Sequence, residues 1–472
     1  MGLLPPQGDR CLERLRTAGK RREKVIVYGD TDIDGCMGTA IMMRALTLIG
    51  AHPIPAFGVG NPAAGPGVRW ESLEPGLHEG ASLVLTVDCA VRDPEIERKL
   101  LEKGVDLWMT DHHPYPPNIC APAVNCCEEG AHFPSLCGAG ISLRLALHLF
   151  PKESPSSTTD DALAVAMLAT LGDAVPLVGE NRSIVLLGVE ALARTEHSGL
   201  LSLRPNTVSI SEEGLLALRR KMIAPLNAAP RFGDVESPLS FFLESDPPAH
   251  SATSQRLIAH NRRRQRRMKS LLTRIGTPKK PKEGRIGLFF SPQLPAEFVS
   301  QVAGRLVFQM GVPFIAFGRA SKGLLRGSCR SLDGLPLRDS AIEALGSLAI
   351  DIGGHPLAFG ITVKESDWNE VEKRLSPLSP SVPPPMERGL EVPFLPPSEI
   401  LVVQESLGPF GPGFRRPYYS LEGARVIEGG KALLWRGESH PLVLRGSDDE
   451  VPLMGRLIPR GSQLQIYAVP SP

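Results

Sequence analysis

The stretch VIVYGDTDIDGCMGTAIMMRAL, residues 25–46, places three aspartates, Asp30, Asp32 and Asp34, directly after a short apolar run. The β-branched residues before them predict a buried strand, and the residues after them predict a helix that closes on Gly50. Three like charges at a strand end repel one another, which would raise their pKa values or destabilise the fold. Two explanations stay open at this point, an acidic turn that caps the helix and a site for a divalent cation.

Two further apolar runs also end in acidic or imidazole side chains. The run ASLVLTVDC contains Asp88 at its end, and GVDLWMTDHH closes with Asp111, His112 and His113. Asp173 follows a predicted helix in LGDAV. Alternating strands and helices predict a mostly parallel sheet, in which ligands bind beyond the carboxyl ends of the strands. We therefore expect one crevice whose mixed carboxylate and imidazole ligands favour manganese and can bridge two ions.

Composition narrows the class of protein. A chain of 472 residues predicts two to four domains, and 42% apolar with 22% charged residues is typical of a soluble globular protein. The sequence shows neither an apolar run of membrane length nor a signal-peptide pattern, so we expect a cytoplasmic protein without a membrane segment. Its eight cysteines are expected to be thiols, and the spacing of Cys120, Cys126, Cys127 and Cys137 fits no common zinc pattern.

Breaks in composition predict the domain organisation. The expected fold class is α/β, with a parallel-sheet domain, a smaller α/β domain joined to it by a long helix, and a C-terminal β-barrel. The joining helix carries NRRRQRRMK, which can either follow a nucleic-acid backbone or form a solvated face. The predicted segments are 1–21 at the N-terminus, 22–250 for the first domain, 251–280 for the helix and linker, 281–365 for the second domain, 366–390 for a proline-rich connector and 391–472 for the barrel.

The order D-x-D-x-D-G, Asp, D-H-H, Asp resembles that of the DHH phosphoesterase superfamily, and GGHPLAFG resembles the G-G-H motif of the associated DHHA1 domain. The segments GDAVPLVGENR, IAPLNAAPRFGD, RGSCRS and ESLGPFGPG are similar to those of the RecJ family, single-strand-specific 5′→3′ DNA exonucleases. The resemblance covers nearly the whole chain from about residue 22. It implies a DHH domain, a DHHA1 domain and an oligonucleotide-binding (OB) fold, in this order.

The resemblance also implies a reaction and a set of residues. The reaction would be hydrolysis of phosphodiester bonds in single-stranded DNA, in repair or recombination, with two Mn²⁺ ions or alternatively Mg²⁺. Single-stranded DNA would be the partner, together with a single-strand-binding protein and a helicase. The implied metal ligands are Asp32, Asp34, Asp88, His112 and Asp173; the catalytic residues are His113, Asp111 and Asp30; and the substrate-binding residues are Ser328, Arg330, Gly353, Gly354, His355, Asn227 and Arg231.

Two positions depart from the family pattern, and two other functions remain open. Tyr28 stands where many relatives carry a histidine, and Arg69 is displaced from the usual position of an arginine. The first alternative is a phosphodiesterase for short oligonucleotides or cyclic dinucleotides, against which the C-terminal segment argues. The second is a non-catalytic DHH scaffold, but such proteins lose acidic motif residues that are all present here.

Overall fold

The protein is described from a computed structural model in which the chain forms two compact units. One unit contains the described residues up to 261 together with those from 388 onward, and the other contains residues 262–387. The structure describes residues 4–58, 67–113, 118–244, 246–276, 278, 281–282, 284–320, 323–332, 335–379 and 397–417, and the strand segments 419–420, 425–427, 432–435, 438–444, 454–460 and 463–469.

The first unit is built on a five-stranded parallel sheet of order β2-β1-β3-β4-β5. Its strands are β1 (Lys24–Gly29), β2 (His52–Phe57), β3 (Leu83–Val87), β4 (Asp106–Asp111) and β5 (Ala123–Asn125). Gly29 is in register with Val87, and Val87 with Thr110, so the central strands end level with one another. The polar residues that follow β1, β3 and β4 therefore emerge at one edge of the sheet, as the sequence predicts.

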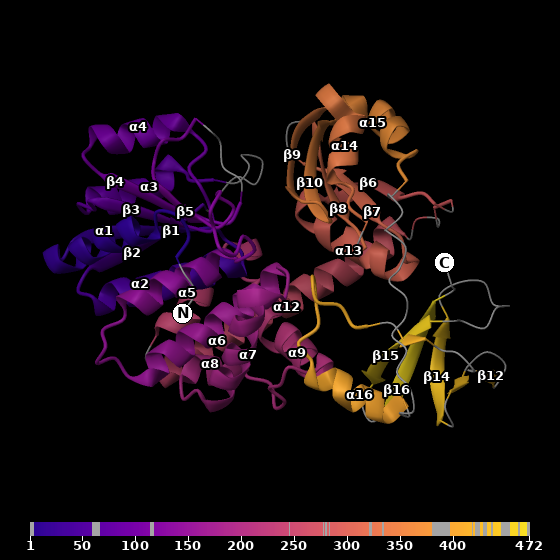
Figure 1. The fold of residues 1–472 in the computed structure, drawn as a ribbon. Coiled ribbons are helices and arrows are strands. Elements are labelled where there is room, and N and C mark those ends of the chain that lie inside the picture. Colours follow the sequence, from indigo (N-terminus) through magenta and orange to yellow (C-terminus); the bar gives the residue numbers. More distant parts are fainter. Residues whose placement is uncertain are drawn as a thin grey trace. The chain divides into compact units, whose positions relative to one another are not determined.

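Helices cover both faces of this sheet, which explains why its central strands are apolar throughout. Val25 and Val27 of β1 pack into the larger core with α1, α2, α5 and α6, whereas Ile26 and Tyr28 pack into a smaller core with α3 and α4 (Figure 1). The helices are α1 (Gly8–Arg21), α2 (Ile33–Leu48), α3 (Trp70–His78), α4 (Pro94–Glu102), α5 (Gly138–Leu149) and α6 (Ser156–Asp173).

A helical segment follows α6 and ends in the long basic helix that the sequence predicts. Its elements are α7 (Gly179–Arg194), α8 (Ser198–Leu203), α9 (Glu212–Leu218), a π-helical turn (Arg219–Ile223), α10 (Ala224–Leu226), α11 (Glu236–Leu243) and α12 (Pro247–Ile275). In α12, Arg262, Arg263, Arg266 and Arg267 are exposed, and the boundary between the two units falls inside this helix. The linker predicted near residue 280 lies partly outside the described residues.

The second unit contains a mixed five-stranded sheet of order β6-β7-β8-β10-β9, with helices on both faces. Phe314 and Ala316 of β7 pack against α13, whereas Ile315 and Phe317 share a core with α14 and α15. The elements are β6 (Gly287–Pro295), α13 (Val299–Met310), β7 (Phe314–Arg319), β8 (Leu324–Arg330), α14 (Arg338–Leu345), β9 (Ala349–His355), β10 (Ala358–Lys364) and α15 (Trp368–Leu375).

The structure differs from the proline-rich connector predicted over 366–390, because the first part of that range is helix α15. Trp368, Val371 and Leu375 recur at helical spacing and pack into the core of the second unit. Most of the prolines that suggested a connector lie further along, in a range that the structure does not describe. A short amphipathic helix beside a proline-rich stretch is easily missed, because about two turns give few apolar repeats.

The C-terminal part begins with α16 (Pro397–Ser406), and its described strands form one open sheet. The strand order is β11-β15-β16-β14-β13-β12, with β11 and β12 at its two ends. The strands are β11 (Tyr419–Ser420), β12 (Arg425–Ile427), β13 (Ala432–Trp435), β14 (Glu438–Leu444), β15 (Met454–Arg460) and β16 (Gln463–Val469). Short strands were predicted here, but a closed barrel is not confirmed among the described residues.

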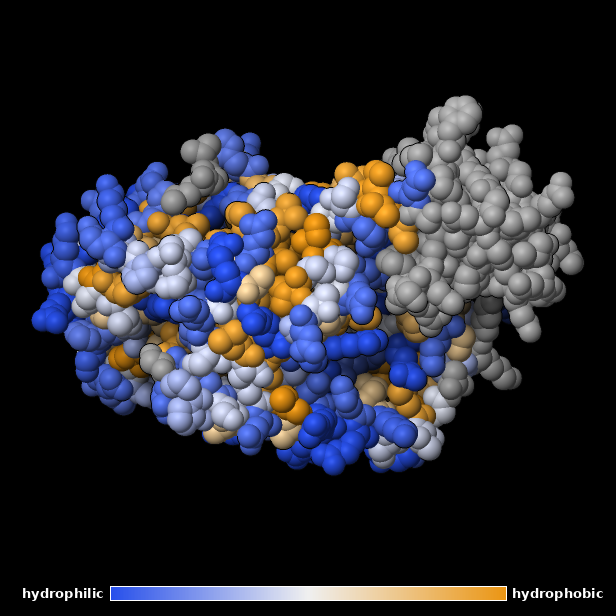
Figure 2. Space-filling view, turned by 90° about the horizontal axis from the view of Figure 1, so that it is seen from below, coloured by the Kyte–Doolittle hydropathy of each residue, from blue (hydrophilic) through white to orange (hydrophobic). Residues whose placement is uncertain are grey.

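The helices of the described part are too short or too polar for any of them to cross a membrane. On the face shown in Figure 2, hydrophobic residues occur in several patches between hydrophilic ones. This intermixing is ordinary for a globular protein, because polar atoms alone cannot cover its surface.

Replacing Leu375 by Ala should lower the free energy of unfolding of the second unit by about 2–5 kcal/mol, since the substitution leaves a cavity in its core. The Leu375 side chain is fully buried. The neighbouring Lys373 is 80% exposed, so Lys373→Ala is the matched control. The measurement is urea unfolding followed by tryptophan fluorescence, because Trp368 packs against Phe290 and Phe317 in this core. Equal stability of the two variants would contradict the packing of α15.

Candidate metal centre

The acidic turn after β1 is held by its own hydrogen bonds. Asp32 is the N-cap of α2, and its Oδ1 accepts from the amides of Asp34 at 2.8 Å and Gly35 at 3.2 Å. A side chain on Gly35 would lie 2.4 Å from the carbonyl oxygen of Asp30, so only glycine fits this tight turn. Burial and the charge of Asp32 raise the pKa of Asp30 to about 7. Helix capping therefore accounts for Asp32, but not for the other two aspartates.

Asp34 is fully buried and is held by the N-terminus of α5. Its two carboxylate oxygens accept hydrogen bonds from the amides of Gly138 at 2.6 Å and Ala139 at 2.8 Å. The helix N-terminus favours a negative charge at this place. Burial nevertheless raises the pKa of Asp34, although His112 opposes the rise. A side chain on Gly138 would lie 2.5 Å from Cβ of Asp88, so glycine is needed for α5 to come this close.

Asp88 follows β3 and has an unusual backbone conformation. Its φ is 59°, in the left-handed region that residues other than glycine seldom adopt. The side chain is buried, and burial together with the charges of Asp34 and Asp32 raises its pKa well above the ordinary value. Backbone strain and a buried, repelled carboxylate in one residue are typical of a functional position.

Asp111 shapes the turn that carries the two histidines. Its Oδ1 accepts from the amides of His112 at 2.7 Å and His113 at 3.1 Å, and lies 2.9 Å from Nδ1 of His113. Burial lowers the pKa of His113, but the hydrogen bond and charge of Asp111 outweigh burial and raise it to about 9. Asp111 therefore holds the backbone of the turn and orients the imidazole of His113, and it is absent from the sets of ligand atoms found among the described residues.

His112 lies at the centre of the cluster. Its Nε2 is 3.1 Å from Oδ1 of Asp88, 3.7 Å from Oδ2 of Asp34 and 3.8 Å from Oδ2 of Asp173, which ends α6. Residues that follow three strands and one that ends a helix thus place a carboxylate oxygen or an imidazole nitrogen within 4 Å of His112 Nε2 or at that atom itself.

Three overlapping sets of ligand atoms can be drawn from these side chains, and the atoms of each set lie within 4.8 Å of one another. Asp88 belongs to two of the sets and His112 to two, so the sets form one continuous cluster. A divalent cation would replace the repulsion between the carboxylates by attraction, and oxygen with imidazole donors suits Mn²⁺. The sets are Asp30, Asp32 and Asp88; Asp88, His112 and His113; and Asp34, His112 and Asp173.

Asn227 and Arg231, predicted to bind substrate, lie beside the acidic turn. Asn227 Oδ1 accepts a hydrogen bond from the amide of Ile33 at 2.9 Å, which supports the turn from the side of α10. Burial lowers the pKa of Arg231, and the charge of Asp32 acts in the opposite direction. Asn227 is therefore a support of the acidic turn, and its carbonyl oxygen is already engaged.

The residues predicted to bind the 5′ end meet on the sheet of the second unit. Across β10, Ala358 pairs with both Arg330 and His355, and Gly360 pairs with both Ser328 and Gly353. Gly354 adopts a φ of 123°, which requires glycine. Arg330 donates to Ser328 Oγ at 3.2 Å and to Ser300 Oγ of α13 at 2.6 Å. The contact of Ser300 with Arg330 could not be predicted from the sequence, because it depends on how α13 packs against the sheet.

The amides of Gly138 and Ala139, which hold Asp34, could not be recognised from the sequence, because every residue except proline has a backbone amide.

Two residues that depart from the family pattern, Tyr28 and Arg69, contact each other. The Tyr28 hydroxyl accepts a hydrogen bond from the amide of Arg69 at 3.1 Å. Tyr28 lies in the smaller core, so its hydroxyl does not replace a histidine in the acidic cluster.

The cysteine cluster does not form a metal site in the part of the chain that the structure describes. Cys126 and Cys137 are buried, Cys120 and Cys127 are exposed, and all four are free thiols. Cys127 Sγ contacts the carbonyl oxygen of His112 at 3.0 Å, and Cys137 Sγ contacts Thr170 at 3.6 Å. The groups of described residues that could hold a metal contain no cysteine.

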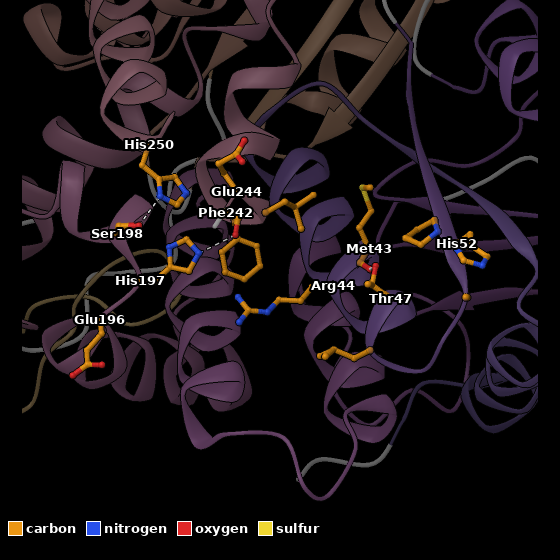
Figure 3. Close-up of a pocket in the computed structure, with 14 residues that line it drawn as sticks. Met43, Arg44, Thr47, His52, Glu196, His197, Ser198, Phe242, Glu244 and His250 are labelled. Atoms are coloured by element: carbon orange, nitrogen blue, oxygen red, sulfur yellow. Dashed lines mark hydrogen bonds between the residues drawn. The ribbon is translucent and has the colours of Figure 1, made fainter. Parts of the chain in front are cut away.

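A separate pocket of about 740 Å³ lies between the C-terminal end of α2, the start of α8 and α12, and the end of α11 (Figure 3). Its imidazoles have local structural partners: His197 Nε2 is 2.9 Å from the carbonyl oxygen of Phe242, and His250 Nδ1 is 2.6 Å from Ser198 Oγ. The pocket includes none of the acidic cluster, and we assign it no function.

Replacing Gly138 by Ala should destabilise the protein by about 1 kcal/mol or more, although alanine is the better helix former. The reason is the new methyl group 2.5 Å from Cβ of Asp88. Gly140→Ala is the control on the same helix, because its nearest neighbour is the flexible Leu136 Cδ2 at 3.1 Å. Thermal unfolding of both variants checks this, and a Gly138→Ala protein as stable as the control would contradict the close approach.

Comparison with known proteins shows which family the sequence of this chain is similar to. Residues 24–170 match the model of the DHH family, N-terminal domain. The single-stranded-DNA-specific exonuclease RecJ of Thermus thermophilus is 31% identical over 438 residues, which are 90% of this chain and 63% of the relative. The RecJ of Bacillus subtilis is 29% identical over 378 residues, 78% of this chain and 47% of the relative. The chain thus spans about half to two thirds of the length of these two relatives.

Solved structures agree with this result. The crystal structure of Thermus thermophilus RecJ in complex with Mn²⁺ has a TM-score of 0.75 at 23% identity, covering 99% of this chain and 71% of that one, and it supports the fold. A crystal structure of an exonuclease RecJ bound to manganese has a TM-score of 0.61 at 25% identity, covering 79% of this chain and 94% of that one. Residues 24–170 therefore match the N-terminal domain of the DHH family, in a chain that is similar to RecJ exonucleases over most of its length.

Proposed function

We propose that the chain is a metal-dependent exonuclease that hydrolyses single-stranded DNA in the 5′→3′ direction. The observation that carries this proposal is the cluster of carboxylates and imidazoles at the carboxyl edge of the parallel sheet, whose ligand atoms lie within 4.8 Å of one another in each set. The names of the RecJ relatives, single-stranded-DNA-specific exonucleases, support the choice of substrate. The 5′→3′ polarity is proposed from the family resemblance of the sequence motifs. From the same likeness we also propose two protein partners, a single-strand-binding protein and a helicase. They would act with this chain on DNA in the cytoplasm.

Asp32, Asp34, Asp88, His112 and Asp173 would hold two divalent cations, with Mn²⁺ preferred and Mg²⁺ as the alternative. Asp88 would bridge the ions, since it belongs to two of the ligand sets. Such ions supply positive charge at the phosphoryl oxygens and lower the pKa of the attacking water. Relief of the repulsion among buried carboxylates would contribute to their binding.

The chain's own residues would orient the substrate and handle protons. His113 has its Nδ1 beside Asp111, so the opposite nitrogen, Nε2, would face the scissile phosphate. The hydrogen bond with Asp111 would hold the imidazole of His113 in place, so that Nε2 could donate to the developing charge. Asp111 would orient His113, and Asp30 would assist the metal ligands or bind metal itself.

The remaining motifs would select the end of the strand. Ser328 and Arg330 would bind a terminal 5′-phosphate, while Gly353, Gly354 and His355 would contact the adjoining nucleotide. The exposed arginines of α12 would follow the DNA backbone. In this proposal residues 281–365 act as the DHHA1 domain, and the C-terminal sheet acts as the OB-like domain that holds a longer strand.

A digestion series tests the proposed activity. Long and short single strands of DNA and RNA, labelled at either end, are incubated with Mn²⁺ or Mg²⁺ and with wild-type protein, Asp34→Asn or Asp106→Asn. Asp106 lies at the opposite end of β4 and is 58% exposed, so it is the matched control. Wild type and Asp106→Asn should release the 5′ label of DNA first, and Asp34→Asn should be slower by about 10²-fold or more.

Other results of this series would redirect the assignment. Preference for strands of a few nucleotides would favour the short-oligonucleotide phosphodiesterase. Cleavage of no substrate by the wild-type protein would favour a scaffold. Release of the 3′ label first would contradict the proposed polarity while leaving the metal centre in place.

Arg330→Ala should reduce kcat/KM on 5′-phosphorylated strands by about 30-fold, because it removes a charge-assisted contact of roughly 2 kcal/mol. Strands with a 5′-hydroxyl should change little. Arg319→Ala is the control, because Arg319 ends β7 in the same unit and pairs with Glu365. Equal losses on the two kinds of strand would rule out a 5′-phosphate pocket at Arg330.

A further inference from the structure

The loop that follows Asp173 is covered by a segment from far along the chain. Residues 174–178 connect α6 to α7, and the amide of Leu177 donates to the carbonyl oxygen of Pro412 at 2.7 Å. A side chain on Gly411 would lie 2.7 Å from Leu177 Cδ1, and one on Gly413 would lie 2.9 Å from Pro176 Cβ. The glycines of the GPFGPG motif therefore allow the 407–414 segment to lie directly on this loop.

Arg182 of α7 holds the 407–414 segment in place. Its guanidinium donates to three consecutive carbonyl oxygens, those of Leu407, of Gly408 at 2.6 Å and of Pro409 at 3.0 Å. Its Cζ also lies 4.4 Å from the centre of the Phe414 ring. A planar fork with five donors suits several carbonyl oxygens at once and also stacks on an aromatic ring, which a lysine cannot do equally well.

The aromatic contact continues into a longer stack that anchors the segment at its other side. The rings of Phe414 and Phe410 are parallel, with centres 5.3 Å apart, and Arg416 lies 4.8 Å from the centre of Phe410. Arg416 in turn pairs with Glu405 of α16 and with Glu212 of α9 at 3.1 Å. The segment is therefore held to two helices of the first unit as well as to the loop.

Asn181 secures the same loop from the inside. Its side chain is fully buried, and its Nδ2 donates to the carbonyl oxygens of Pro176 at 3.0 Å and Ser135 at 2.5 Å. Ser135 lies three residues before Gly138, whose amide binds Asp34. One amide group thus ties the loop after Asp173 to the start of the helix that holds Asp34.

We infer that Arg182 is a positioning residue for Asp173, and that the 407–414 segment is a structural part of the metal centre. Ala174 adopts a φ of 60°, so the chain turns sharply directly after Asp173. The direction of the Asp173 carboxylate then depends on where residues 174–178 lie, and these are clamped between Asn181 and the segment. The inference rests on the proposed function, because it takes Asp173 to be a metal ligand.

The proposed coupling between the 407–414 segment and metal binding acts in both directions, and wild-type protein alone can reveal it. If the 407–414 segment favours metal binding, metal binding must stabilise the segment by the same coupling free energy. Hydrogen exchange of the full chain should therefore slow at the Leu177 amide and in residues 405–416 when Mn²⁺ is added. Unchanged exchange in both places, with Mn²⁺ bound, would overturn the inference without requiring any variant.

Calorimetric titration with Mn²⁺ supplies the second test. Arg182→Met should weaken Mn²⁺ binding by about tenfold, as expected for a residue that supports a ligand through its neighbours. Arg182→Lys should recover only part of the loss, because one ammonium cannot reach three carbonyl oxygens and stack as well. The control is Arg194→Met, which removes the same charge from the far end of α7, where the 54% exposed side chain of Arg194 pairs with Asp160.

The outcomes separate this inference from the proposed function. Wild-type protein that binds no Mn²⁺ would overturn the proposed function and the role of Arg182 together. Wild-type protein that binds Mn²⁺, with Arg182→Met and Arg194→Met both unchanged in affinity, would leave the metal centre standing and overturn the role of Arg182 alone. If Arg182→Met does not fold, the hydrogen-exchange test and Arg182→Lys still decide.

Discussion

The structure depends on holding buried carboxylates close together against their mutual repulsion. Asp34 and Asp88 are both buried, and burial together with the charge of Asp34 raises the pKa of Asp88. Unpaired charges in a protein interior cost several kcal/mol unless hydrogen bonds or counter-charges compensate. The chain compensates partly, with two amides of α5 on Asp34 and with His112 in the middle of the group. The remainder of the deficit is what a divalent cation would relieve.

Glycine and unusual backbone conformations appear where this crowding requires them. Gly35 lets the acidic turn fold tightly, and Gly138 lets α5 approach Asp88. Asp88 and Ala174, with positive φ, redirect the chain at one residue of the acidic cluster and directly after another, Asp173. Such features reduce stability locally and persist because the surrounding core is large and well packed. The apolar strands on both sides of the site supply that stability.

The supports of the centre are side chains that are not themselves among its proposed metal ligands. Asn227 holds the acidic turn, Asn181 joins two loops, and Arg182 binds the segment that precedes the C-terminal sheet. These contacts hold residues from distant parts of the first unit around the acidic cluster. A residue that binds no metal can therefore be as necessary to the site as the aspartates, because geometry within a fraction of an ångström decides ligand binding.

The sequence by itself determined the parallel sheet, the order of the acidic and D-H-H motifs and the edge at which they meet, because short continuous apolar runs and strand-end polar residues are local signals. It could not identify the amides of Gly138 and Ala139, the contact of Ser300 with Arg330, or the role of Asn227, since these depend on the approach of elements far apart in the chain. It also mistook helix α15 for a connector, because few apolar repeats fit in a short helix. Tertiary packing alone decided these points, since only the folded chain brings a backbone donor within hydrogen-bonding distance of a remote carboxylate.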